Sequence, residues 1–176
     1  VGRGVAIPLE GGRGGRLLVD GGPDPARLLR LLDARVPPWD RRIDVVVATH
    51  PHEDHVGGLP TLLDRYRVGT ILANGMTGPG PTATTLGALL AADPRSATLV
   101  AGDRLVVDGE ALGVLWPPRG AVPSTAPGTG REINDTSIVL LGTARSRSFL
   151  LMGDVEDDVD PLLVGRERRG LVEGSQ

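Results

Sequence analysis

The sequence contains no cysteine, which excludes disulfide bridges, a thiolate nucleophile and a cysteine-held zinc knuckle. Any metal must therefore be bound by nitrogen and oxygen donors. Aromatic residues make up only 2% of the 176 residues, which argues against a surface that stacks nucleobases. No apolar run approaches the roughly 20 residues that a membrane-spanning helix needs. The chain is therefore expected to form one soluble globular domain.

Lysine is also absent, so the 19 basic residues are all arginine, against 22 acidic residues. The formal net charge of -3 predicts no broad attraction to polyphosphate. Any contact with a nucleic acid would have to come from a local cluster of arginines near the histidine motif described below. The candidate residues are Arg41, Arg42, Arg65 and Arg67. The alternative is that they are solvated side chains whose charges are balanced by nearby acidic residues.

Strand and helix patterns alternate along the chain, which predicts an α/β fold. The apolar segment from Ile43 to Ala48 is typical of a strand buried on both faces, and Thr49 and His50 follow at its C-terminal end. Asp24 is placed to cap a helix that starts at Pro25. Further strands are predicted at 5–9, 16–19, 68–72, 97–100, 104–107, 112–115, 138–141 and 148–152, further helices at 59–66 and 82–92, and a loop at 117–130.

All three histidines lie within six consecutive residues, at His50, His52 and His55. A loop leaving a strand can turn His50 and His52 toward one ion, while Asp54 and His55 begin a helix and can face a second ion. A divalent ion with one open position lowers the pKa of bound water to about 7. The sequence therefore predicts one or two divalent ions, Zn²⁺ or Mn²⁺. The alternative is a solvated loop whose histidines bind no metal.

This segment resembles the His-x-His-x-Asp-His signature of the metallo-β-lactamase superfamily, which follows an apolar strand. The resemblance implies an αββα sandwich of mixed sheets with outer helices. It also implies that Asp20 supports the metal loop and that Asp154 bridges two ions. The alternative to these roles is that Asp20 is an ordinary turn residue and that Asp154 is a turn residue or a helix cap.

Six segments, in order along the chain, are similar to one branch of that superfamily: 1–4, 19–23, 48–59, 115–118, 134–137 and 153–156. The branch is the C-terminal metallo-β-lactamase-like domain of the DNA-uptake competence protein ComEC family, and the likeness runs to about Leu163. It implies a soluble domain attached to a bacterial membrane protein, with a channel domain on the same polypeptide. It also implies DNA as a partner and hydrolysis of the strand that is not imported.

The chain departs from that family in two places. The family's opening Asp-Val-Gly-Gln-Gly-Asp lacks its first Asp here, and Arg3 and Val5 replace the Gln and the second Asp. The family also continues to a His-His-Gly-Ser motif whose histidine completes the metal site, whereas no histidine follows His55. The resemblance therefore implies a chain truncated before that motif. Five candidate donors remain, and they are enough for one ion but fewer than two ions would need. They are His50, His52, Asp54, His55 and Asp154.

These residues predict a metallo-hydrolase in which a metal-bound hydroxide attacks phosphorus, with Asp54 orienting the water or accepting its proton, and the resemblance implies that DNA is the substrate. Asn134 and Ser137 are candidate substrate contacts at the rim of the site, with a strand-edge hydrogen bond as the alternative. Two other functions stay open, because the fold does not decide the substrate. They are a metal-binding module with little or no turnover, and a hydrolase of lactones, thioesters or β-lactams.

The metallo-β-lactamase-like domain is expected to span residues 1–164 and to be incomplete at its C-terminus. The charged stretch 165–176 contains few apolar residues and is expected to be a loosely ordered tail. The sequence opens without an initiator methionine or the basic and apolar segments of a secretory signal. An excised domain is therefore expected.

Overall fold

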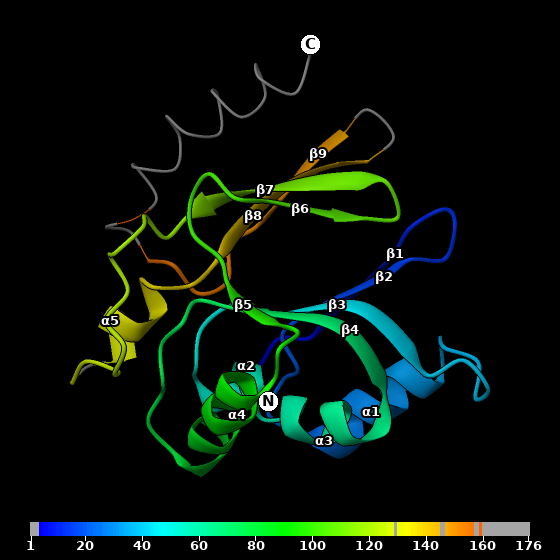
Figure 1. Cartoon of the computed structure of the whole chain (residues 1–176), viewed down its shortest axis with the longest axis horizontal. Coiled ribbons are helices and arrows are strands. Elements are labelled where there is room, and N and C mark those ends of the chain that lie inside the picture. The colour runs from blue at the N-terminus through cyan, green and yellow to red at the C-terminus, as the bar shows by residue number, and fades with distance from the viewer. Residues whose placement is uncertain (1–3, 129, 145–146, 157–158, 160–176) are drawn as a thin grey trace.

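A computed structural model describes residues 4–128, 130–144, 147–156 and 159. These residues form two sheets, with strands in the order β1-β2-β3-β4-β5 and β6-β7-β8-β9 (Figure 1). The first sheet contains β1 (Ile7–Glu10), β2 (Arg16–Val19), β3 (Arg42–Ala48), β4 (Arg67–Ala73) and β5 (Ser96–Thr98). The second contains β6 (Arg104–Val107), β7 (Glu110–Trp116), β8 (Val139–Ala144) and β9 (Arg147–Leu151). The helices are α1 (Pro25–Asp33), α2 (Glu53–Val56), α3 (Leu59–Arg65), α4 (Pro81–Ala92) and α5 (Gly130–Asn134).

Helices α1, α3 and α4 cover one face of the first sheet, and the second sheet packs against its other face (Figure 1). Neighbouring residues of β3 contribute to both interfaces. Val46 packs with the helices, whereas Val45 and Val47 pack between the sheets. A third apolar cluster joins Leu115 and Val139 of the second sheet to Val159. The predicted α/β sandwich of two sheets with outer helices is confirmed, with a mixed first sheet and a second sheet whose strand pairs are all antiparallel.

The order of parallel strands determines where polar residues gather. Strand β1 pairs antiparallel with β2 across a glycine-rich turn, while β2, β3, β4 and β5 run parallel. The C-terminal ends of β2, β3 and β4 therefore meet at one edge of the sheet. That edge carries Asp20, Thr49, His50 and Asn74, which follow these strands.

The predicted helix cap at Asp24 is confirmed. Its carboxylate accepts hydrogen bonds from the backbone N–H groups of Ala26 at 2.8 Å and Arg27 at 3.1 Å. These bonds satisfy two of the donors that the first turn of a helix leaves unpaired.

Two predicted segments differ clearly from the structure: the predicted strand 97–100 is only partly strand, because β5 ends at Thr98, and at the end of the predicted loop 117–130 Gly130 begins α5. A helix of five residues is too short to show a helical apolar period in the sequence.

Within the described ranges, no helix combines the length and apolar character that crossing a membrane requires. The longest of them, α4, has 12 residues. The predicted tail, 165–176, lies outside the described residues, and so does the predicted domain end at residue 164.

Tyr66 allows a test of the packing between α3 and α1. Its hydroxyl donates a 2.7 Å hydrogen bond to Asp33, and burial together with this bond raises the Tyr66 pKa to about 12. The chain has no lysine or cysteine and a single tyrosine, so no other non-arginine side chain titrates in this alkaline range.

Because the folded pKa lies above the unfolded value of about 10, the neutral phenol stabilises the fold below pH 10. This contribution is lost as the pH rises from about 10 to about 12. Tyr66→Phe should therefore cost about 1 kcal/mol at neutral pH and flatten the alkaline fall in stability. Denaturant unfolding of both proteins at neutral and alkaline pH measures this. An equally steep fall in both proteins would contradict it.

Candidate metal centre

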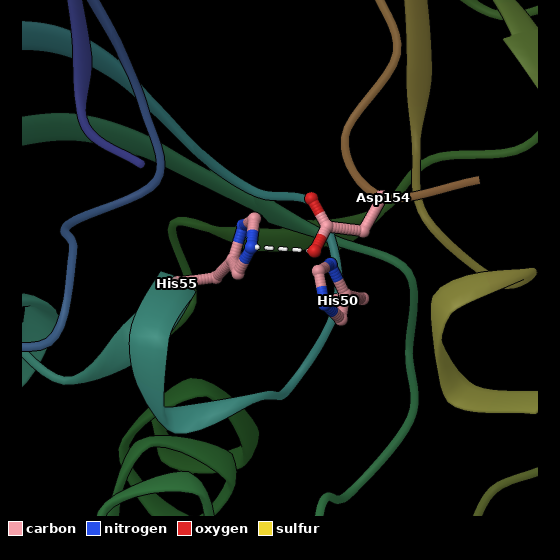
Figure 2. A group of neighbouring side chains, drawn as sticks. All are labelled: His50, His55 and Asp154. Carbon is pink, nitrogen blue, oxygen red and sulfur yellow. Dashed lines mark ion pairs between the residues drawn. The ribbon is translucent and has the colours of Figure 1, made fainter. Parts of the chain in front are cut away.

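The polar side chains of the histidine motif gather where the ends of the two sheets meet. His50 follows β3, His55 lies on α2, and Asp154 follows β9 of the second sheet. Figure 2 shows the three side chains pointing toward one another. Residues more than 100 positions apart in the sequence thus share one site.

A buried carboxylate, that of Asp20, organises the first-sheet side of this site. Asp20 is 1% exposed and accepts hydrogen bonds from the backbone N–H and the hydroxyl of Thr49, both at 2.8 Å. Its Oδ2 also lies 2.8 Å from Nδ1 of His55. Burial lowers the pKa of His55, but the hydrogen bond and charge of Asp20 outweigh burial, so the net shift is upward. Asp20 thus lies behind His55, in the position of a supporting residue.

His50 is held as a neutral imidazole. It is 1% exposed, and burial, followed by the nearby His55 and His52, lowers its pKa to about 2. Its Nε2 lies 3.1 Å from Nδ1 of His52, and the two rings meet edge to face. At neutral pH one ring nitrogen of His50 therefore keeps a lone pair that can bind a cation.

The donor set fits a divalent metal ion. Ligand atoms of His50, His55 and Asp154 all lie within 4.8 Å of one another, and no other cluster of three such donors occurs among the described residues. His55 Nε2 is 3.2 Å from Asp154 Oδ2, the pair joined by a dashed line in Figure 2. Imidazole nitrogens with a carboxylate are donors that zinc and manganese accept. His52 adjoins this set through His50.

Asp54 lies on α2, directly before His55, and is partly buried. Its negative charge is among the causes that raise the His55 pKa, so the carboxylate lies near that imidazole. Its backbone carbonyl accepts a hydrogen bond from the N–H of Val5 at 3.2 Å. The carboxylate of Asp54 is not among the donors that lie within 4.8 Å of one another, which are those of His50, His55 and Asp154.

The two candidate substrate contacts have different surroundings in the structure. Ser137 is 0% exposed, and its hydroxyl lies 3.1 Å from Nδ1 of His50. Asn134 lies on α5 and donates a 3.0 Å hydrogen bond to Glu156. A rim position for Ser137 is therefore wrong, because the residue is enclosed beneath the metal ligands. Asn134 instead ties α5 to the segment that carries Asp154.

The predicted arginine cluster is not at the metal centre. Arg42 and Arg67 are paired at the start of β3 and β4, whereas His50 follows the end of β3, roughly 20 Å along a seven-residue strand. Arg41 lies over the ring of Tyr66 at 5.9 Å, and Arg65 is 3.4 Å from Asp64. These arginines flank the motif helix in sequence, but the strand direction places them at the opposite edge of the sheet.

Several supporting contacts had no signal in the sequence. Glu53, inside the histidine motif, accepts a 3.1 Å hydrogen bond from the backbone N–H of Thr82 at the start of α4. Glu156 contacts Arg131 at 3.3 Å as well as Asn134, which fastens α5 beside Asp154. Such contacts depend on which loops the sheets bring together, so no local pattern announces them.

Two loops border His52. Gly130, the first residue of α5, lies so close that a Cβ there would come within 3.8 Å of the imidazole. Gly78 packs on Pro51, where a Cβ would overlap the proline ring. Thr77 and Thr125 join the two loops through a parallel β-bridge, with Thr77 N donating to Ser124 O at 2.9 Å. Glycine and threonine residues of these two loops thus lie on this side of the site.

Asp20→Ala tests the buried network. The change leaves the Thr49 donors and Nδ1 of His55 without their buried acceptor, so the free energy of unfolding should fall by about 3 kcal/mol. Asp24→Ala is a matched control, because it removes only the α1 cap and should cost about 1 kcal/mol. Denaturant unfolding of the metal-free proteins measures both. Equal losses would show that Asp20 is an ordinary turn residue.

The comparisons with known proteins agree with this geometry. A family model of the metallo-β-lactamase superfamily matches residues 4–156. None of the curated proteins compared with the sequence matches it. Similar solved structures include MEM-A1, a subclass B3 metallo-β-lactamase from a soil metagenome library, with 14% identity and a TM-score of 0.53 over 82% of this chain. Another is the metallo-β-lactamase fold protein YhfI from Bacillus subtilis, with 17% identity and a TM-score of 0.55 over 89% of this chain.

At these identities the structural matches show the fold alone. The chain spans 54% of the length of MEM-A1 and 58% of that of YhfI. The family match, by contrast, covers both sheets and every metal-ligand candidate from His50 to Asp154. The chain belongs to the metallo-β-lactamase superfamily.

Proposed function

We propose that this chain is a metal-dependent hydrolase that cleaves DNA phosphodiesters, with the metal held by His50, His52, His55 and Asp154. The observation that carries the metal site is the convergence of His50, His55 and Asp154 within 4.8 Å. A neutral, buried His50 strengthens it, since a protonated imidazole cannot bind a cation.

A bound divalent ion supplies Lewis acidity, which lowers the pKa of a coordinated water and polarises the substrate. The chain's own residues supply position and proton transfer. Asp20 orients His55 through Nδ1 and so leaves Nε2 directed at Asp154. Asp154 is 38% exposed, which lets its carboxylate reach the open side of the site. Asp54 beside His55 is the carboxylate proposed to accept a proton from the attacking water.

DNA is proposed as the substrate because six ordered segments resemble the ComEC family. The four arginines at the opposite sheet edge offer no phosphate contact near the metal. Arg131 is better placed, because it follows Gly130 beside His52 and its side chain is 51% exposed. Its guanidinium is held 3.3 Å from Glu156 and is the proposed phosphate contact. By the same resemblance, the domain is proposed to act beside a membrane channel that imports single-stranded DNA.

Metal binding is tested by titrating the purified protein with Zn²⁺ and Mn²⁺. At least one ion per chain is expected, with an increase in thermal stability that chelation reverses, because the ion binds only the folded cluster. Asp154→Asn should weaken binding, whereas Asp64→Asn on the exposed face of α3 should not. A folded protein that stays free of metal at saturating zinc and manganese would remove the proposed function.

Hydrolysis is tested with single-stranded and duplex DNA and with lactone, thioester and β-lactam substrates. Metal-dependent cleavage of DNA is expected, and His52→Ala should abolish it while the fold persists, because the half-buried ring makes its side-chain hydrogen bond and ring contact with His50 alone among the described residues. Asp64→Asn is the active control. Cleavage of a carbonyl substrate alone would replace DNA as the substrate, and equal turnover in His52→Ala would contradict the assigned site.

A further inference from the structure

Ser137 connects the two halves of the metal centre through a single hydroxyl group. Its Oγ lies 3.1 Å from Nδ1 of His50 and accepts a 3.2 Å hydrogen bond from the backbone N–H of Asp154. His50 extends from the first sheet and Asp154 from the second. Ser137 is fully buried, so this hydroxyl makes its contacts away from solvent.

The hydrogen bonds around His50 constrain where its ring proton lies. A metal bound through Nε2, the nitrogen that faces His52, needs the lone pair there, so the proton must lie on Nδ1. The Thr49 hydroxyl directs its one proton to Asp20 at 2.8 Å and can only accept from Nδ1. The Ser137 hydroxyl is the other group within reach of Nδ1, also at 3.1 Å. Thr49 thus favours the metal-binding tautomer, and the Ser137 oxygen can accept from the same Nδ1–H.

The backbone at Gly153 keeps Ser137 in this place. Gly153 has a φ of +57°, a left-handed conformation that favours glycine, and a Cβ there would lie 2.7 Å from Cβ of Ser137. The turn that delivers Asp154 therefore packs directly on the serine. If Ser137 only contacted substrate or only made a strand-edge hydrogen bond, Gly153 would not need to pack this closely on it.

We infer that Ser137 is a positioning residue of the metal centre, whose hydroxyl accepts the Nδ1 proton of metal-bound His50 and holds the Asp154 backbone beside it. This role rests on the proposed metal binding, and it adds a residue outside the ligand set. Its loss should weaken the metal site without emptying it, because Thr49 still accepts from Nδ1.

Ser137→Ala tests this role against Ser96→Ala, which removes a buried serine hydroxyl that has no hydrogen-bond partner among the described residues. Partners that orient a metal-binding histidine typically contribute 10- to 100-fold in affinity, so Ser137→Ala should bind zinc about 10-fold more weakly. Ser96→Ala should bind zinc as the wild type does. The Co²⁺-loaded Ser137→Ala protein should also show a shifted visible absorption spectrum, which a purely structural role would leave unchanged.

Ring-nitrogen NMR of the zinc-loaded wild type tests the same bond without a variant, and only three histidines contribute signals. A slowly exchanging proton on Nδ1 of His50 is expected. Wild-type zinc affinity in Ser137→Ala, or an unprotonated Nδ1 in the loaded protein, would overturn the inference while leaving the proposed function intact. Absence of zinc binding in the wild type would overturn both.

Discussion

The buried carboxylate of Asp20 is the interaction on which the rest of the site depends. It fixes Thr49 through two hydrogen bonds and orients His55 through a third, each 2.8 Å long. A carboxylate 1% exposed is tolerated because these donors replace the water it has lost. Through one residue, the end of β2 sets the position of the loop that leaves β3, and with it the direction of the imidazoles.

The metal centre also requires the sandwich to close. His50 and His55 belong to the first sheet, whereas Asp154 follows the last strand of the second. Ile138, just before β8, donates a backbone hydrogen bond to Thr49 at 3.0 Å, so the sheets are joined directly beneath the ligands. Because the same packing that buries the apolar faces brings the donors together, formation of the core and of the site are coupled.

Local sequence patterns predicted most of the secondary structure. The apolar run at β3 buries valines on both faces of the sheet, and Asp24 caps α1, as the sequence predicted. Both predictions succeeded because strand burial and helix capping depend on a few neighbouring residues. The arginines were misplaced for the opposite reason. Arg65 and Arg67 lie near the histidines in sequence, yet α3 ends at Arg65 and β4 begins at Arg67, both far from His50, a distance that only the strand direction reveals.

The sequence by itself determined the histidine motif, the buried strand that precedes it and the superfamily to which the chain belongs, because these depend on residue patterns within short segments. Only the tertiary structure decided which partners each donor has. Ser137 lies 87 residues from His50, and Asp154 lies 99 residues from His55, so neither contact exists until the two sheets pack. Hydrogen bonds of this kind depend on distances between separate strands, which spacing along the chain does not specify.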